Sequence, residues 1–351
     1  MKIGILTLHR ANNYGAALQC YALQRTLQSL GYDAWVIDYR QPDTERSYRP
    51  FQWNSICQHI LSPKLLCKDL TIRPLLAILR QISYNRFRGK YFRTTQPVRH
   101  ATDMPQDFDV YLIGSDQLWS IQCLDNNIEP VYFGEFLHFR DSRIDGYAIS
   151  SNIESLETIG KEKLSQYLKN FHVLSVREKT IAEYILQETG FKTRIDIDPT
   201  LLVDSAVWEA ITPRLRVKGG YVLTYFLLPE QRKYAAAFAR RFGLRIIEVG
   251  KVAMSPTDFL AYVKHATYII GGSFHIAVFS IVFQKNFFII KKNNGFDVRS
   301  ASLLSNLHLE NRMIEAEDLP HVDVSIPADF VTASAAIIAL REQSVKYLGN
   351  L

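Results

Sequence analysis

The sequence predicts an α/β protein with two Rossmann-like lobes that face a central cleft. The chain has 351 residues, which exceeds what one hydrophobic core usually serves. Strand-like and helix-like patterns alternate along it, and the alternation restarts near residue 205. We therefore expect one lobe at residues 1–204 and a second at 205–351, with the last helix packing back on the first lobe.

The first lobe opens with a strand, a helix and a second strand. A strand-like run covers residues 2–8, and Leu18, Leu23 and Leu27 then recur at helical spacing. The next strand-like run is 34–39, so the opening is a βαβ unit, which predicts a parallel sheet. Further buried strands are expected at 109–113, 144–149 and 173–176, the first of them ending at a loop over 114–117.

The second lobe repeats the alternation. We expect strands at 221–226, 245–249, 268–270 and 287–290, and a helix at 230–242. The apolar stretch 268–290 is long enough to cross a membrane, but polar residues and glycines interrupt it, so it predicts strand, loop, helix and strand. The segment 328–347 predicts a helix with an apolar stripe made of Ala328, Val331, Ala335, Ile338 and Leu340.

Composition narrows the class of protein. With 47% hydrophobic and 22% charged residues, the chain is typical of a soluble globular enzyme. Its four cysteines lack metal-ligand spacing and indicate reduced thiols; they are Cys20, Cys57, Cys67 and Cys123. The first residues lack a secretory signal. From both observations we expect a cytoplasmic location. The sequence contains neither GxGxxG, a P-loop nor HExxH, so no cofactor and no metal site is predicted.

One segment concentrates positive charge. Residues 61–100 carry a net +8, whereas the whole chain carries +6. Leucine and isoleucine alternate with the basic residues, which fits a solvated helix whose apolar side packs on the core, and also fits peripheral contact with an anionic membrane. Nucleic-acid binding is disfavoured because no recognition motif accompanies the charge. The cations expected to meet a membrane are Arg80, Arg86, Arg88 and Lys90.

Five segments, in this order along the chain, resemble motifs of the polysaccharide pyruvyltransferase family: Ala11–Gln19, Gly114–Trp119, Leu174–Glu178, Asp198–Leu202 and Ser273–Ser280. A basic helical insertion at about 45–105 lies outside these motifs. The resemblance implies a fold similar to GT-B glycosyltransferases. It also implies an enzyme that uses phosphoenolpyruvate to build a pyruvate ketal on a sugar of an exopolysaccharide or of its lipid-linked precursor. Two alternatives stay open: a GT-B glycosyltransferase that uses a nucleotide sugar, and a non-catalytic relative in a glycan-assembly complex.

The resemblance also implies roles for individual residues. His275 is the expected proton donor and Asp116 the expected base. Arg177, Ser273, Lys291 and Arg299 are expected to bind the donor, and Asn12, Asn13, Tyr14 and Gln117 the acceptor sugar. Two positions depart from the family pattern, because Ile276 replaces a usual glycine and Ser273 stands where many branches carry arginine.

Each of these residues also has a purely structural interpretation. His275 could be a core histidine, and Arg177 could pair with its neighbour Glu178. Asp116 could cap its own loop, and Asn12 and Asn13 could serve turn chemistry.

Overall fold

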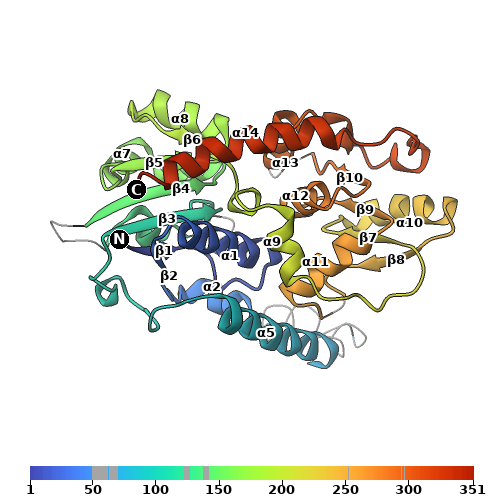
Figure 1. Cartoon of the computed structure of the whole chain (residues 1–351), viewed down its shortest axis with the longest axis horizontal. Coiled ribbons are helices and arrows are strands. Elements are labelled where there is room, and N and C mark those ends of the chain that lie inside the picture. The colour runs from blue at the N-terminus through green and yellow to red at the C-terminus, as the bar shows by residue number, and fades with distance from the viewer. Residues whose placement is uncertain are drawn as a thin grey trace. The chain divides into compact units, whose positions relative to one another are not determined.

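A computed structural model of the chain describes residues 1–49, 62, 70–121, 127–136, 142–251, 253–293, 295 and 297–351. Two compact units make up the chain (Figure 1): Met1–Leu202 with Gln343–Leu351 form unit 1, and Val203–Glu342 form unit 2. Cys57, Cys67 and Cys123 lie outside the described residues, as do Lys64 and Lys68 of the basic segment.

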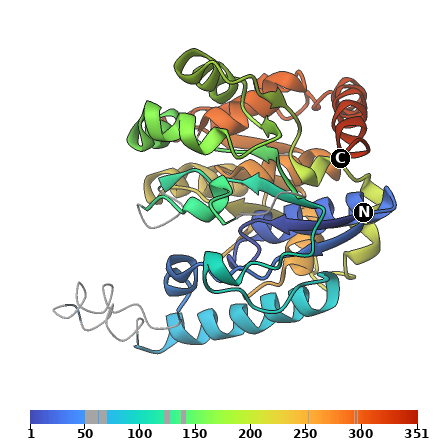
Figure 2. The same ribbon diagram turned by 90° about the vertical axis from the view of Figure 1, so that its left-hand side faces the viewer.

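Unit 1 is built on a six-stranded parallel sheet with the order β2-β1-β3-β4-β5-β6. The strands are β1 (Lys2–Leu6), β2 (Asp33–Val36), β3 (Val110–Asp116), β4 (Arg143–Ile149), β5 (Val173–Val176) and β6 (Arg194–Ile195). The helices are α1 (Tyr14–Ser29), α2 (Pro42–Ser47), α5 (Ile72–Tyr91), α6 (Ile153–Ile159), α7 (Lys161–Leu168) and α8 (Lys179–Thr189). In Figure 2, α5 (cyan) lies at the foot of unit 1, away from α7 and α8 (green).

Unit 2 is built on a five-stranded parallel sheet with the order β11-β10-β9-β7-β8. Its strands are β7 (Tyr221–Tyr225), β8 (Arg245–Glu248), β9 (Tyr268–Gly271), β10 (Phe287–Ile290) and β11 (Met313–Ile314). Its helices are α9 (Ser205–Ile211), α10 (Arg232–Arg241), α11 (Pro256–His265), α12 (Phe274–Val282) and α13 (Asp297–Asn306). The last helix, α14 (Phe330–Leu348), begins in unit 2 and ends in unit 1.

Each unit has an aromatic core beside its sheet. In unit 1 the ring of Phe133 stacks on Trp119 and on Tyr167, with centroid separations of 4.7 and 4.4 Å. In unit 2 Trp208 packs edge-on against Phe279 at 5.0 Å. Because parallel sheets are covered on both faces, their strands are apolar along their whole length, as β10 is. This explains why the strands were visible in the sequence.

The α/β class with two parallel sheets is confirmed, and so is the order strand, loop, helix and strand over 268–290. Two expectations were wrong in detail. The strand expected at 109–113 continues to Asp116, because it keeps pairing with β4 up to Ile149. The apolar stripe expected on the last helix does not face the core, since Val331 is 84% exposed and the buried positions include Ala333 and Ile337.

None of the helices in the described part of the chain is long and apolar enough to cross a membrane.

Candidate functional site

In unit 2, three loops meet at the carboxyl ends of β7, β9 and β10. Gly272 follows β9, and a Cβ atom placed on it would lie 2.6 Å from Cε of Lys292 and 2.8 Å from the carbonyl oxygen of Phe226. Any larger residue would therefore push these two neighbours away. Phe226 has a φ of +59° and is 56% exposed, which is unusual for an aromatic residue. The glycine thus allows the three loops to approach one another closely.

Helix α12 begins at this point. Ser273 occupies the expected N-cap position, but its side chain makes no capping hydrogen bond. His275 lies in the first turn, is buried, and packs edge-on against Phe274 with ring centroids 5.1 Å apart. The first turn of a helix presents backbone N–H groups and the positive end of the helix dipole, which together favour an anion.

Two cations approach the start of α12. The guanidinium carbon of Arg299 lies 5.8 Å from the ring centroid of Phe274, and Nζ of Lys292 lies 5.2 Å from that of Phe226. Burial lowers the pKa of Lys292, and the charge of Asp297 works against that effect. One carboxylate oxygen of Asp297 accepts hydrogen bonds from the backbone N–H groups of Lys292 and Asn293, at 2.8 and 2.7 Å. We call Lys292, Arg299 and the first turn of α12 the α12 cationic site.

Lys291 is placed differently from its neighbour. Its ammonium group lies 3.0 Å from a carboxylate oxygen of Glu315, and its carbonyl oxygen accepts a hydrogen bond of 2.7 Å from Gln231. Together with Tyr234 and Asn293, these residues line a pocket of about 210 Å³, which Lys292 also borders. The prediction singled out Lys291 and missed Lys292 and Phe226. The signal for Lys292 was present, since it also follows strand β10.

In unit 1, buried polar side chains link the motif segments to one another. Gln19 donates a hydrogen bond of 2.8 Å to the hydroxyl of Thr7, which donates one of 2.9 Å to the carbonyl of Ser115. The hydroxyl of Ser115 accepts a hydrogen bond of 2.6 Å from Arg177. Arg177 in turn lies 2.7 Å from a carboxylate oxygen of Asp198. These contacts connect four separate segments at the carboxyl ends of β1, β3 and β5.

The glycine of the second motif has a steric explanation. Gly114 has a φ of +139°, and a Cβ atom there would lie 2.0 Å from the carbonyl oxygen of Tyr147. Strand β3 therefore approaches β4 closely at this point, and only glycine fits.

A model of the family described as polysaccharide pyruvyl transferase matches residues 13–293. The chain belongs to this family. It is therefore an enzyme, as the sequence motifs predicted. The five motif segments comprise the last residues of β3 and β5, loops at strand ends and the starts of helices, and the carboxyl ends of the strands are where enzymes on parallel sheets usually bind their ligands.

Solved structures similar to this pyruvyl transferase family member share little sequence identity with it. The Staphylococcus aureus MnaA–UDP co-structure shares 8% identity, covers 91% of this chain and 86% of its own, and has a TM-score of 0.48. Arabidopsis thaliana UGT89C1 shares 11% identity, covers 99% of this chain and 98% of its own, and has a TM-score of 0.46. The spinosyn rhamnosyltransferase SpnG shares 10% identity, covers 100% of this chain and 100% of its own, and has a TM-score of 0.44. No curated protein matches the chain.

The residues of the first family motif are held by the protein itself. Asn13 is the N-cap of α1, and its side-chain oxygen accepts from the N–H groups of Gly15 and Ala16 at 2.8 and 3.3 Å. Asn12 donates a hydrogen bond of 2.6 Å to Gln81 and is 8% exposed. Tyr14 is buried, with its ring 5.7 Å from that of Tyr84. The structure therefore gives all three residues a role in positioning the β1–α1 loop.

Asp116 and Arg177 also have contacts within unit 1. One carboxylate oxygen of Asp116 accepts a hydrogen bond of 2.9 Å from the backbone N–H of Gln117, which is the loop-capping contact of the structural alternative. Both residues are 8% exposed. Arg177 forms an ion pair with Asp198, and the carboxylate of Glu178 accepts a hydrogen bond of 2.6 Å from Ser150.

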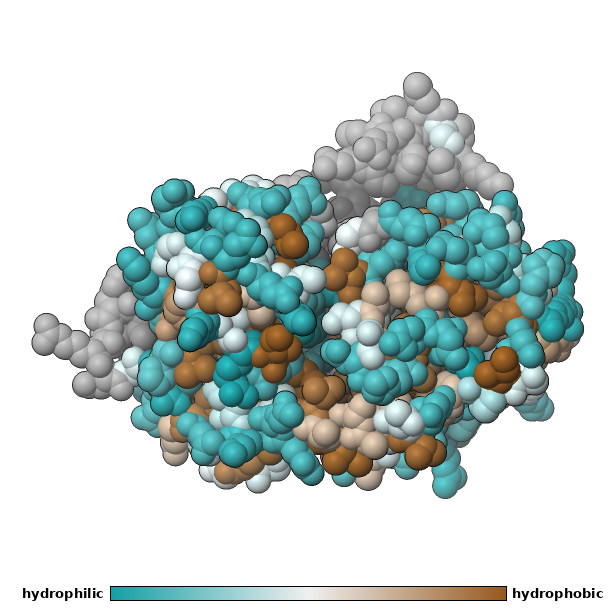
Figure 3. All heavy atoms as spheres, turned by 90° about the horizontal axis from the view of Figure 1, so that it is seen from above, coloured by the Kyte–Doolittle hydropathy of each residue, from teal (hydrophilic) through white to brown (hydrophobic). Residues whose placement is uncertain are grey.

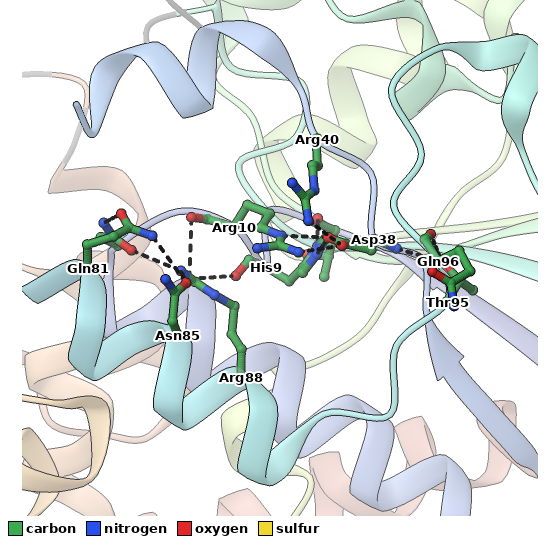
Figure 4. Close-up of polar contacts among 11 residues, drawn as sticks. His9, Arg10, Asp38, Arg40, Gln81, Asn85, Arg88, Thr95 and Gln96 are labelled. Carbon is green, nitrogen blue, oxygen red and sulfur yellow. Dashed lines mark hydrogen bonds and ion pairs between the residues drawn. The ribbon is translucent and has the colours of Figure 1, made fainter.

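Figure 4 shows a further network beside the β1–α1 loop, in which His9, Arg10 and Arg40 surround the carboxylate of Asp38. Burial alone would raise the pKa of Asp38, but hydrogen bonds from His9 and Arg10 outweigh it and lower the pKa. Asp38 therefore stays ionised. Its contacts with His9 and Arg10 hold the beginning of the β1–α1 loop, and Asn13 at the end of that loop caps α1.

Within the described residues, His, Cys, Asp and Glu side chains nowhere form a group of three that could hold a metal ion.

Proposed function

We propose that this enzyme transfers a pyruvyl group from phosphoenolpyruvate to a sugar of a cell-surface polysaccharide or of its lipid-linked precursor, and forms a ketal. Family membership supports the reaction class. The observation that carries the donor assignment is the α12 cationic site, where Lys292 and Arg299 approach the first turn of a buried helix. We retain the cytoplasm as the proposed location.

Phosphoenolpyruvate carries a phosphate and a carboxylate, so a binding site must supply several positive groups. The backbone N–H groups at the start of α12 suit one anionic group. Lys292 and Arg299 supply full positive charges for the other, and an arginine can bind a carboxylate or a phosphate through two parallel hydrogen bonds. Lys292 and Arg299 thus take the place of the arginine that many branches carry at the position of Ser273.

The proposed reaction assigns a proton to His275. Protonated His275 gives its proton to the methylene carbon of the donor, and a sugar hydroxyl adds its oxygen to C2 and loses its proton to a base. The C2–O bond to phosphate then breaks, and phosphate leaves. A second hydroxyl of the same sugar then adds to C2 and closes the ketal. The proton of this hydroxyl passes to the released phosphate or to solvent.

Asp116 is the candidate base for the first hydroxyl, and Asn12, Asn13, Tyr14 and Gln117 are the candidate acceptor residues. Their assignment rests on the resemblance of their motifs to those of the family. Asn13 caps α1 in the structure, whereas Asp116 is the last residue of β3 and Gln117 follows it, so Asp116 and Gln117 are the more direct candidates.

The test replaces Lys292 by methionine. We expect Lys292→Met to abolish the thermal stabilisation that phosphoenolpyruvate gives the wild-type protein without added metal, and to abolish ketal formation. Its own stability should stay equal or rise, because burial lowers the pKa of this lysine, which means that folding disfavours its charge. Differential scanning fluorimetry and assays of phosphate and ketal check this.

Lys291→Met is the matched control, because it removes a neighbouring charge that pairs with Glu315. It should keep the stabilisation by the donor. His275→Gln should keep donor binding and lose turnover, since it retains a hydrogen-bonding side chain without a titratable proton. Stabilisation by nucleotide sugars alone would instead favour a glycosyltransferase.

A further inference from the structure

Helix α5 carries an apolar stripe that faces away from its own unit. Four side chains lie on one helical face at spacings of three and four residues, and they are 42–57% exposed: Ile72, Leu75, Leu79 and Ile82. Ile78 beside them is 41% exposed, and Leu70 just before the helix is 50% exposed. The alternative in which the apolar side of this helix packs on the core is therefore wrong for these residues.

The same helix is strongly basic. Over Ile72–Tyr91 it contains five lysines and arginines and no acidic residue. Arg86 follows Ile82 by four residues and Lys90 follows Arg86 by four, so both extend the apolar stripe on the same face. Arg73, Arg86 and Lys90 are exposed. On this face the first turns are apolar and the last turn is cationic. We call the face formed by Ile72, Leu75, Leu79, Ile82, Arg86 and Lys90 the α5 outer face.

The inner side of α5 is fixed to unit 1, so the helix cannot rotate to bury the stripe. Tyr84 and Phe87 are buried and contact Tyr14 and Tyr21 at ring distances of 5.7 and 6.4 Å. Arg88 is 6% exposed, which excludes it from the cations expected to meet a membrane.

Figure 4 shows Gln81, Asn85 and Arg88 of α5 pointing toward the β1–α1 loop. Arg88 donates to the carbonyl oxygens of His9 and Arg10 at 3.3 and 3.4 Å. Burial lowers the pKa of Arg88 to about 10, so it remains charged at neutral pH. The helix is therefore held in one orientation by aromatic packing and by charged hydrogen bonds.

From this geometry we infer that the α5 outer face is a docking surface for an anionic lipid membrane. An amphipathic helix that lies in the interface buries apolar side chains among the lipids while its lysines and arginines meet anionic headgroups. A second copy of this chain would bring the same positive charge against itself, which like-charge repulsion opposes. Figure 3 shows a face of the molecule on which hydrophobic residues are interspersed among hydrophilic ones.

Docking there would place α5 between the lipid surface and the β1–α1 loop, which carries Asn12, Asn13 and Tyr14 of the candidate acceptor residues, so the loop would lie about one helix diameter from the lipids. The benefit of docking for catalysis rests on the proposed function, whereas membrane binding by α5 itself does not depend on the donor site. A lipid-linked sugar is confined to that surface, so an enzyme that visits it gains a higher local concentration of acceptor.

The test is sedimentation with phosphatidylcholine vesicles that either contain or lack phosphatidylglycerol. We expect the full-length protein to sediment with the anionic vesicles at low salt and to be released as salt rises. The double variant Arg86→Gln/Lys90→Gln should lower the partition coefficient on the order of 30-fold, since each cation near the surface contributes about 1 kcal/mol. Leu75→Gln/Leu79→Gln should weaken binding at every salt concentration.

The matched control is Lys161→Gln/Lys163→Gln, which removes two exposed cations from α7 and should bind like wild type. All variants should keep the stabilisation by phosphoenolpyruvate, which separates this inference from the donor proposal. Equal binding to both vesicle types, or binding to neither, would overturn it. A concentration-dependent dimer that Leu79→Gln dissociates would show instead that a second copy covers the face.

Discussion

Lys291 and Lys292 are neighbours at the end of one strand, yet their side chains meet different surroundings. Successive residues of a strand project to opposite sides, and this alternation continues into the loop. It directs Lys291 to Glu315 and Lys292 to Gly272 and Phe226. A sequence shows that two lysines follow a strand but not which of them turns toward the helix, because that depends on where the loops of neighbouring strands lie.

The ion pair between Arg177 and Asp198 gives a prediction about stability. Both side chains are almost fully buried, at 6% and 1% exposure, so removing Arg177 leaves the buried carboxylate of Asp198 without the charge of that guanidinium. We expect Arg177→Gln to lower the free energy of unfolding by about 3–5 kcal/mol. Urea denaturation followed by circular dichroism measures this.

Lys179→Gln is the control for that experiment. Lys179 pairs with Glu183 at 3.5 Å and both side chains are exposed, at 77% and 62%, so its loss should cost less than about 1 kcal/mol. If Arg177→Gln kept wild-type stability and lost binding of phosphoenolpyruvate, Arg177 would be a donor-binding residue, as the resemblance implied.

Among the elements, α1 shows how a motif can be structural. The family motif over Ala11–Gln19 contains the end of a loop and the first turns of a helix, and Asn13 stands at the junction as the N-cap. A sequence reveals this junction, because asparagine before a helical run of leucines is a typical start of a helix. It cannot reveal that Asn12 is covered by Gln81 and Arg88, since these come from α5, outside every recognised motif.

We predict that Asn13→Ala lowers the free energy of unfolding by about 1 kcal/mol, through the loss of the two capping hydrogen bonds. Asn13→Ser should restore most of that stability, because serine also caps helices well. Thermal unfolding of both variants tests the cap. If both variants lost activity on the acceptor equally while only alanine lost stability, Asn13 would also bind the sugar.

The helix α5 shows a second limit of sequence analysis at this scale. Its alternation of leucine, isoleucine and basic residues was visible, and it left a membrane contact and a core-facing helix both open. These two arrangements differ only in which face of α5 packs against unit 1, and that depends on contacts with residues far away in the sequence. Here Tyr84 and Phe87 are the residues that meet the unit, and the leucines and isoleucines are left outside.

At the scale of the whole molecule, the chain returns to unit 1 at its end. Residues Gln343–Leu351 belong to unit 1, although the preceding part of α14 belongs to unit 2. The hydroxyl of Ser344 donates to Asp196 at 2.9 Å and accepts from the backbone N–H of Ile197 at 3.2 Å. Tyr347 stacks on Tyr147 with ring centroids 6.2 Å apart. The last residues thus complete the packing around β4 and β6.

These contacts predict that deleting Gln343–Leu351 destabilises unit 1 more than unit 2. The deletion exposes the ring of Tyr147 and removes Leu348, which is fully buried. The loss of buried apolar surface alone corresponds to roughly 1.5–3 kcal/mol for such a side chain. Hydrogen–deuterium exchange should therefore show faster exchange in β4 and β5, and unchanged exchange in β7 and β9, since local stability follows local packing.

Deleting only Asn350 and Leu351 is the matched control, because it shortens the same end while keeping Ser344, Tyr347 and Leu348. It should leave exchange in both sheets as in the full chain. Equal acceleration in the two sheets after the longer deletion would mean that the units unfold as one cooperative block. Faster exchange in unit 2 alone would contradict the assignment of the last residues to unit 1. The experiment therefore tests whether the end of α14 stabilises unit 1 without changing the local stability of unit 2.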